Sequence, residues 1–284
     1  MIKKPIVKIY TPESHLRSPS IFIKGMFTDL IRSKDLSWQL AVRDIKTQYR
    51  QSILGIIWAF ITPLATTITW IFLNKTGIIK LSPTGIPYPL YVFSGTLLWS
   101  IFIESLQMPL KLSNAAKNTL SKINFPREAI IISGVYQTLF NGAIKVFLIF
   151  ITFLIFNIYP NWQILFFPFA FISLILAGTS IGLLITPIGM LYNDIGRVIP
   201  LGMQFIMYIT PVVFPMPKEG WVHYIFLYNP LTQIIMVCRD WLSGTESNFF
   251  LGFLIVNIGV LILLLIAWAI YRAVMPVIIE RMNN

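Results

Sequence analysis

The sequence predicts an all-α integral membrane protein with six transmembrane helices, and three observations carry this prediction. Hydrophobic residues make up 56% of the 284 residues and charged residues only 12%, whereas an ordinary soluble domain has about 25% charged residues. The mean hydropathy is +0.75. Six apolar stretches are long enough to cross a bilayer, which takes about 20 residues. The net charge of +11 gathers beside the first stretch, a placement typical of topology signals rather than of a nucleic-acid partner.

The residues before the first span divide into two parts. Residues 1–20 contain three prolines and scattered charges, so we expect an extended cytoplasmic tail. Residues 21–53 follow, and apolar residues recur at helical spacing over 21–42. This pattern predicts an amphipathic helix that lies in the cytoplasmic membrane interface, among membrane lipids. A helix packed on a soluble partner is the alternative. Residues 54–284 then form the membrane domain.

Several sequence features bear on the shape and packing of the predicted spans. The third and fourth are longer than a bilayer requires, which predicts tilt. Pro63 removes a backbone donor and is expected to bend the first span. Gly178 and Gly182 form a small-xxx-small pair that allows close helix packing in the fourth span. The six predicted spans cover residues 54–73, 89–110, 129–157, 163–191, 198–216 and 249–271.

The distribution of cations predicts that both termini are cytoplasmic. With this orientation, seventeen Lys and Arg residues fall in cytoplasmic segments and four in outer segments, while Lys145 lies within a span. Positive charge is retained on the cytoplasmic side of bilayers. The N-terminus lacks the short apolar core and small-residue cleavage site of a removable signal peptide. We therefore expect the chain to be inserted by its own spans.

The sequence lacks the parts of several kinds of active site. It contains no G-x-x-x-x-G-K-[ST] phosphate loop. His15 and His223 stand alone, and Cys238 is the one cysteine, so we expect neither a metal site nor a cofactor in this chain. No pair of carboxylates suggests hydrolase or transferase chemistry. This pattern favours transport that another component drives.

Two ionisable residues lie inside predicted spans, where they usually face protein or water. Glu104 lies about 9 Å, and Lys145 about 24 Å, from the inner end of its span at a rise of about 1.5 Å per residue. This difference in depth argues against an ion pair between them. Lys145 also ends a polar row with Ser133, Gln137 and Asn141 at four-residue spacing. The row could line a hydrophilic conduit, or it could hold helices together.

Hydroxyl and aromatic side chains occur together along three of the predicted spans. Such surfaces suit carbohydrate, because sugar C–H faces stack on rings while sugar hydroxyls take hydrogen-bond partners. Aromatic belts at the membrane interface and ordinary helix packing are the alternative. The candidates for a glycan channel are Trp58, Thr62, Thr66, Thr69, Trp70, Tyr91, Trp99, Phe205 and Tyr208.

Two connecting segments have unusual composition. The apolar segment after the fifth span is broken by prolines at 211, 215, 217 and 230. Short re-entrant helices in the outer leaflet would satisfy this pattern, and an ordinary outer loop is the alternative. The polar segment "KLSNAAKNTLSKINFPRE", residues 111–128, is longer than a plain connector requires. A short cytoplasmic helix there could dock a soluble subunit.

The stretch "RDIKTQYRQSILGIIWAFITPL" at 43–64 and the stretch "SKINFPRE" at 121–128 together resemble the membrane subunits of type 2 ABC exporters of bacterial polysaccharide. The closest likeness is to O-antigen export permeases of the Wzm type. The resemblance covers nearly the whole chain, including "YNDIGRVIP" at 192–200. Gln48 stands where a second arginine is common in the family, a departure that puts little in doubt.

The resemblance implies a partnership and a substrate. Two copies of the permease would form a channel at their interface, with two cytosolic ABC ATPase subunits that bind the ATP and Mg²⁺. The complex would move an undecaprenyl-diphosphate-linked glycan out of the cytoplasm across the bacterial inner membrane. The ATPase would dock on a coupling helix, with Asn118, Lys122, Phe125, Pro126, Arg127 and Glu128. The outer gate would contain Pro211, Phe214, Pro215, Trp221, Tyr228 and Pro230.

The resemblance also places residues 43–52 as a gate helix at the cytoplasmic mouth. Arg43, Lys46 and Arg50 would there bind the substrate diphosphate, since cations bind phosphate by charge-assisted hydrogen bonds. Attraction to anionic lipid headgroups is the alternative, at about 1 kcal/mol per cation. Export of capsule or teichoic-acid polymer is a related possibility. A membrane-embedded enzyme acting on lipid-linked sugars, and a secondary transporter built around Glu104 or Lys145, are possibilities of other classes.

Overall fold

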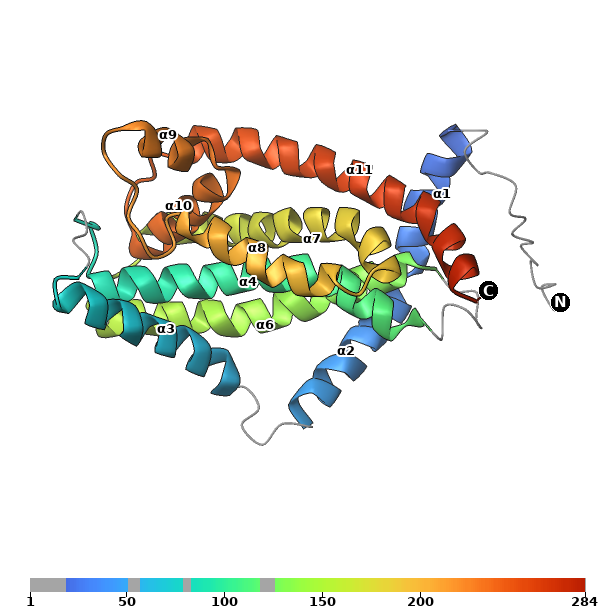
Figure 1. Cartoon of the computed structure of the whole chain (residues 1–284), viewed down its shortest axis with the longest axis horizontal. Helices are drawn as coiled ribbons and strands as arrows, with labels where there is room; N and C mark the ends of the chain where they lie inside the picture. The colour runs from blue at the N-terminus through green and yellow to red at the C-terminus, as the bar shows by residue number, and fades with distance from the viewer. Residues whose placement is uncertain (1–18, 51–56, 79–82, 118–125, 284) are drawn as a thin grey trace.

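The structure is a computed structural model that describes residues 19–50, 57–78, 83–117 and 126–283. These residues form helices and their connections, without a β-strand among them (Figure 1). The predicted all-α class is confirmed for this part of the chain. The expected tail at 1–20 lies almost wholly outside the described residues.

Four helices are long and apolar enough to cross a membrane: Tyr88–Ala115, Glu128–Ile155, Trp162–Leu191 and Phe250–Arg281. They correspond to α4 (Tyr88–Ala115), α6 (Glu128–Ile155), α7 (Phe167–Leu191) with the preceding 3-10 turn η3 (Trp162–Phe166), and α11 (Phe250–Asn283). Their positions match four of the predicted spans. The chain is therefore a multi-pass membrane protein. The prediction that the last span ends at 271 is wrong for the helix, because α11 continues to Asn283.

The other two predicted spans coincide with shorter helices. Helix α3 covers Trp58–Lys75, and the start of the predicted span at 54 lies outside the described residues. Helix α8 covers Ile195–Tyr208, and its 14 residues extend about 21 Å. It ends before residue 216 because Pro211 cannot donate a backbone hydrogen bond. Two short helices follow, α9 (Trp221–Tyr228) and α10 (Pro230–Ser243). Both lie at the end of the molecule toward which α8 runs.

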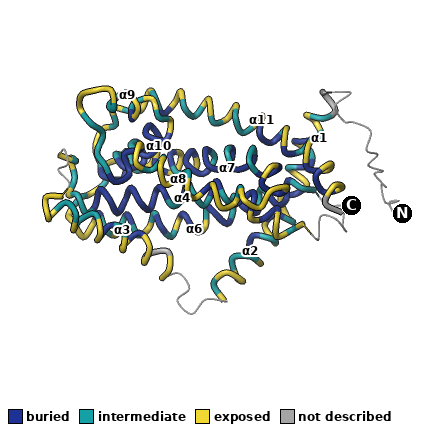
Figure 2. Tube along the Cα trace, in the orientation of Figure 1, coloured by how far each residue is buried: buried dark blue, intermediate teal, exposed yellow. Residues whose placement is uncertain are grey.

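Helices α4 and α7 form the centre of the molecule (Figure 2). The two glycines predicted to allow close packing do so. A Cβ atom at Gly182 would overlap the backbone oxygen of Leu106, and one at Gly178 would overlap the Ser105 hydroxyl. Glycine is required at both positions because the helix backbones approach too closely for any side chain.

The N-terminal arm consists of α1 (Pro19–Arg32) and α2 (Lys34–Arg50). The predicted single helix over 21–42 is wrong, because the helix breaks at Ser33 and α2 then continues through the basic stretch. The Ser33 and Ser37 hydroxyls donate to the carbonyls of Asp29 and Ser33, at 2.5 and 2.6 Å. Such bonds to the preceding turn bend helices. Helix α1 exposes Ile23, Phe27 and Ile31, as an interface helix requires.

Candidate functional site

A polar network joins the arm helix α2 to α4 and α6. Lys145 Nζ on α6 lies 2.8 Å from Glu104 Oε2 on α4, and Asn141 Nδ2 donates to Glu104 Oε1 at 2.5 Å. The Tyr49 hydroxyl on α2 donates to Asn141 Oδ1 at 2.9 Å. Burial, and then the negative charge of Glu104, raise the pKa of Tyr49, so its hydroxyl remains a neutral donor. Asn141 thus connects the arm to the buried ion pair.

The sequence argument against a Glu104–Lys145 pair is wrong. Helix α4 continues from 110 to Ala115, and these five further residues place Glu104 about 7.5 Å deeper than we expected. The rest of the difference in depth is spanned by the long lysine side chain. Depth estimated from hydropathy alone is therefore too coarse to exclude a pair between neighbouring helices.

The polar row on α6 contacts protein along its length in the described structure. Gln137 Nε2 donates to Asp44 Oδ2 on α2 at 3.2 Å, and Ser133 Oγ donates to the backbone of its own helix. The row therefore holds helices together in this structure, as the second of the two interpretations proposed. Asp44 was missed from the sequence, since its partner lies 93 residues away.

The three predicted gate cations, Arg43, Lys46 and Arg50, are all exposed on α2. Their spacing of three and four residues places them on one side of the helix. Arg43 forms an ion pair with the neighbouring Asp44 at 2.7 Å, and its side chain remains 67% exposed. The arm therefore presents a row of cations while its opposite side is fixed to α6.

The channel candidates divide into exposed and buried groups. The exposed candidates are Trp58, Thr62, Thr69, Phe205 and Tyr208. Two others on α3, Thr66 and Trp70, are half-buried. The Thr66 and Thr69 hydroxyls donate to the preceding turn of α3. Tyr91 and Trp99, by contrast, are 3% and 6% exposed, so in this conformation both pack within the protomer core.

An aromatic cluster joins two channel candidates to one residue of the predicted outer gate. The Trp70 ring on α3 lies 5.0 Å from the Phe214 ring and 6.3 Å from the Tyr208 ring on α8. The Tyr208 and Phe214 rings lie 6.2 Å apart. The turn after α8 is thus packed against the C-terminal half of α3. Of the other gate candidates, Pro211 is buried, Pro215 is half-buried, and Trp221, Tyr228 and Pro230 are exposed.

A buried arginine on α10 holds the same turn from the other side. Arg239 is 2% exposed, and its Nη2 donates to the carbonyl of Pro211 at 2.9 Å. The guanidinium lies 3.7 Å from the centre of the Tyr91 ring, and the Tyr91 hydroxyl also donates to Pro211. Burial raises the pKa of Asp240 to about 6, although a hydrogen bond with Ser247 and then the charge of Arg239 oppose this shift. This role was not predicted from the sequence, although a lone arginine in the apolar stretch "IIMVCRDWL" was the available signal.

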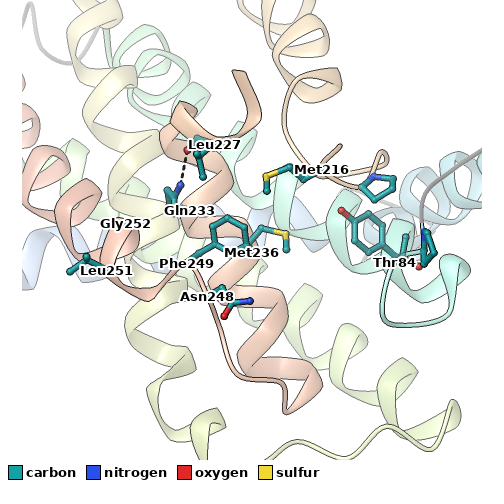
Figure 3. A pocket seen from close by; sticks show the side chains of 12 residues that line it. Thr84, Met216, Leu227, Gln233, Met236, Asn248, Phe249, Leu251 and Gly252 are labelled. Carbon is teal, nitrogen blue, oxygen red and sulfur yellow. Dashed lines mark hydrogen bonds between the residues drawn. The ribbon is translucent and has the colours of Figure 1, made fainter. Parts of the chain in front are cut away.

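An open pocket of ≈ 670 Å³ lies between the turn after α8, helix α10 and the start of α11 (Figure 3). Gln233 projects into this region and donates to the carbonyl of Leu227 at 2.7 Å. A Cβ atom at Gly252 would overlap Gln233 Oε1, so glycine leaves room for the amide. Among the described residues that line it, the side chains include aromatic rings, thioethers and amides, and none is charged.

A second ionic cluster is centred on Arg272 of α11. Arg272 donates to Asp29 of α1 at 2.6 Å and to Glu128, the first residue of α6. Glu128 was predicted for coupling through the resemblance, and the structure shows it buried. Pro126 and Arg127 are half-buried, whereas Asn118, Lys122 and Phe125 lie outside the described residues. Asp29 and Arg272 were missed, because 243 residues separate them.

Comparison with known protein families matches residues 36–242 to the ABC-2 type transporter family. The chain belongs to this family. The match begins at the start of α2 and ends in α10. It therefore includes the cation row, the Glu104 network and the Arg239 cluster of this ABC-2 family member.

Individual relatives are distant but cover most of the chain. The O-antigen export system permease protein RfbA of Klebsiella pneumoniae is 23% identical over 229 residues, or 78% of this chain and 85% of that protein. The RfbA protein of Myxococcus xanthus is 22% identical over 188 residues, or 66% and 71%. The polysialic acid transport protein KpsM of Escherichia coli is 23% identical over 247 residues, or 82% and 91%. The resemblance to polysaccharide export permeases is thereby confirmed.

Proposed function

We propose that this ABC-2 family member is the channel-forming subunit of an ATP-driven exporter. It moves undecaprenyl-diphosphate-linked O-antigen from the cytoplasm across the inner membrane. The observation that carries the proposal is the similarity to O-antigen export permeases over most of both chains. Capsule-type polymer is the second candidate substrate, because a polysialic acid transport protein is similar at the same level and over a larger share of the chain.

The proposed assembly contains two copies of this chain and two ATPase subunits. Helices α3 and α8 expose large aromatic and aliphatic side chains, among them Trp58, Phe72, Leu201 and Phe205. These faces supply an interface for the second copy and the wall of a channel. With α3 and α8 counted, the chain has six spans and both termini are cytoplasmic. Helices α9 and α10 then dip into the outer leaflet and complete the crossing that α8 begins.

The cation row on α2 is the proposed entry site for the lipid diphosphate. Its three side chains are exposed, while Gln137 and Asn141 fix the opposite side of the helix to α6. Because the helix that carries the cations is held in place, less backbone entropy is lost when an anion binds. Arginine provides the bidentate geometry that phosphate groups accept.

Depletion of the protein tests the proposed function. Long lipid-linked polymer should accumulate on the cytoplasmic leaflet while its synthesis continues, because the export step alone is lost. The measurement is the sidedness of the polymer, by antibody access in spheroplasts before and after permeabilisation. Loss of synthesis would indicate an enzyme instead. Undiminished export without any partner ATPase would indicate a secondary transporter.

Charge reversal on α2 tests the entry site. The variant Arg43→Glu/Arg50→Glu should lower export about tenfold or more at unchanged protein level, since charge-assisted hydrogen bonds contribute about 1.5–3 kcal/mol each and 1.36 kcal/mol is a factor of ten. The matched control is Arg32→Glu/Lys34→Glu, an equal charge change at exposed positions of the same arm. An equal loss of export in the control would indicate that the cations of the arm act by attraction to anionic lipid headgroups.

A further inference from the structure

We propose that Arg272 is a positioning residue that fixes the N-terminal arm to the cytoplasmic end of α6. Through it, movement of α6 reaches the cation row on α2. The inference rests on the proposed function for what drives that movement. It concerns two residues, Asp29 and Arg272, that lie outside the segment matched to the family.

One guanidinium makes the connection. Arg272 Nη2 lies 2.6 Å from Asp29 Oδ2, and Nη1 pairs with Glu128 Oε1. The side chains are 20%, 11% and 6% exposed, for Arg272, Asp29 and Glu128 respectively, so water screens the pairs little. Because arginine donates from separate nitrogens of a rigid planar group, it can hold both carboxylates at a fixed separation. A lysine could not reproduce this geometry.

The surrounding contacts restrict the arm further. The Phe27 ring of α1 packs edge-on against Trp268 of α11, with centres 5.6 Å apart. The Arg272 guanidinium lies 5.8 Å from the Phe22 ring. A Cβ atom at Gly25 would lie 3.2 Å from Arg272 Nη2, so glycine lets α1 approach the guanidinium. Helix α1 is therefore placed by side chains one turn apart on α11.

The same part of α11 also contacts the end of α4. The Tyr271 hydroxyl lies 3.2 Å from the Ser113 hydroxyl, and both residues are buried. Consecutive residues of α11 thus bind the last turns of α4 and the first residue of α6. The two helix ends and α1 are linked at one point, at the end of the molecule where α11 terminates (Figure 1).

The arm is consequently attached to α6 at two levels. Arg272 attaches α1 at Glu128, and the Tyr49–Asn141 and Gln137–Asp44 bonds attach α2 further along the helix. A displacement of α6 must move the arm with it unless one attachment breaks. The cation row moves as a result of this linkage.

Asp29→Asn is the informative substitution. Arg272 bonds two carboxylates among the described residues, so removal of the Asp29 charge leaves Arg272 paired with Glu128. Arg272→Met, in contrast, would leave two carboxylates together and threaten the fold. The matched control is Asp35→Asn, which makes the same change at an exposed position on α2.

The first measurement uses the full complex with its ATPase in proteoliposomes. Polymer export and ATP hydrolysis are recorded together for the wild type, Asp29→Asn and Asp35→Asn. We expect Asp29→Asn to retain ATP hydrolysis within about twofold and to lose at least about fivefold in polymer exported per ATP. The control should retain both. If Asp29→Asn exported as much polymer per ATP as the wild type, the inference would be overturned. It would also be overturned if export and ATP hydrolysis fell together, in proportion to a loss of assembled complex.

The second measurement needs no ATPase, so it separates this inference from the proposed function. Cys238 is buried, so a nitroxide can be attached selectively at Ile31→Cys, an exposed position of α1 that is 75% exposed in the native chain. In the permease alone, we expect greater label mobility with Asp29→Asn than in the wild-type or Asp35→Asn background. Equal mobility in all three would overturn the attachment. Export that proceeds without ATP would instead refute the proposed function.

Discussion

Lys145→Met is expected to lower the free energy of unfolding by about 3 kcal/mol or more, the range for a buried ion pair that loses one partner. The Lys145 and Glu104 side chains are 11% and 21% exposed, and their charged atoms lie 2.8 Å apart. Without the ammonium group, the neutral amide of Asn141 is the one hydrogen-bond partner that the described residues leave to the Glu104 carboxylate. The measurement is an unfolding titration of the purified protein in mixed micelles.

Two comparisons make the result specific to the pair. The double variant Glu104→Gln/Lys145→Met should recover most of the lost stability, because no isolated charge remains and an amide can still accept from Asn141. Lys111→Met is the matched control, since Lys111 is exposed near the end of α4. It should change stability by no more than about 0.5 kcal/mol. A double variant as unstable as the single one would show that the pair does not act as a unit.

Gly182→Ala is expected to destabilise the protein by about 1–3 kcal/mol, the cost of overpacking a dense core. The new Cβ atom would overlap the backbone oxygen of Leu106 and lie 3.1 Å from Pro109 Cγ. A backbone atom cannot rotate away, so α4 and α7 must separate. Because these helices form the centre of the molecule, the separation loosens contacts on both sides. The fraction of folded protein after heating, by size exclusion, reports the change.

Another helix glycine has room for a Cβ atom, so a glycine-to-alanine substitution there is a matched control. Gly259 lies in α11 and is exposed, and a Cβ atom there would meet nothing within 4 Å. Gly259→Ala should be neutral or stabilising by up to about 1 kcal/mol, since alanine is the better helix former. A similar loss at both positions would contradict the packing argument and indicate a general intolerance to substitution.

The long spans could be predicted from the sequence because each is a property of a local stretch. Residues 129–157 and 163–191 match α6 and the η3–α7 helix closely, since about 20 consecutive apolar residues have few alternatives in a bilayer. Helix ends that lie beyond the apolar stretch were predicted less accurately. Helix α11 continues twelve residues past its predicted end at 271, because its last turns still bury Met275, Ile278 and Ile279 in the core.

The candidate site was predicted in part. The placement of Arg43, Lys46 and Arg50 on one side of a helix follows from their spacing, and the structure shows that all three are exposed. Their role as gate residues remains a prediction. Burial of Tyr91 and Trp99 could not be foreseen, because aromatic residues in apolar spans are compatible with lipid, channel and core alike. Arg239 carried a recognisable signal, whereas Asp29 and Arg272 did not.

The sequence by itself determined the membrane environment, the helical class, the approximate positions of the long spans and the family. Each of these depends on composition, on hydrophobic length or on a short local motif. Only the tertiary structure decided which polar groups meet. Glu104 forms an ion pair with Lys145, Asn141 accepts a hydrogen bond from Tyr49, and Arg272 binds both Asp29 and Glu128. Such pairs depend on helix register and side-chain reach between distant segments, and a shift of one helical turn, about 5.4 Å, is enough to make or break them.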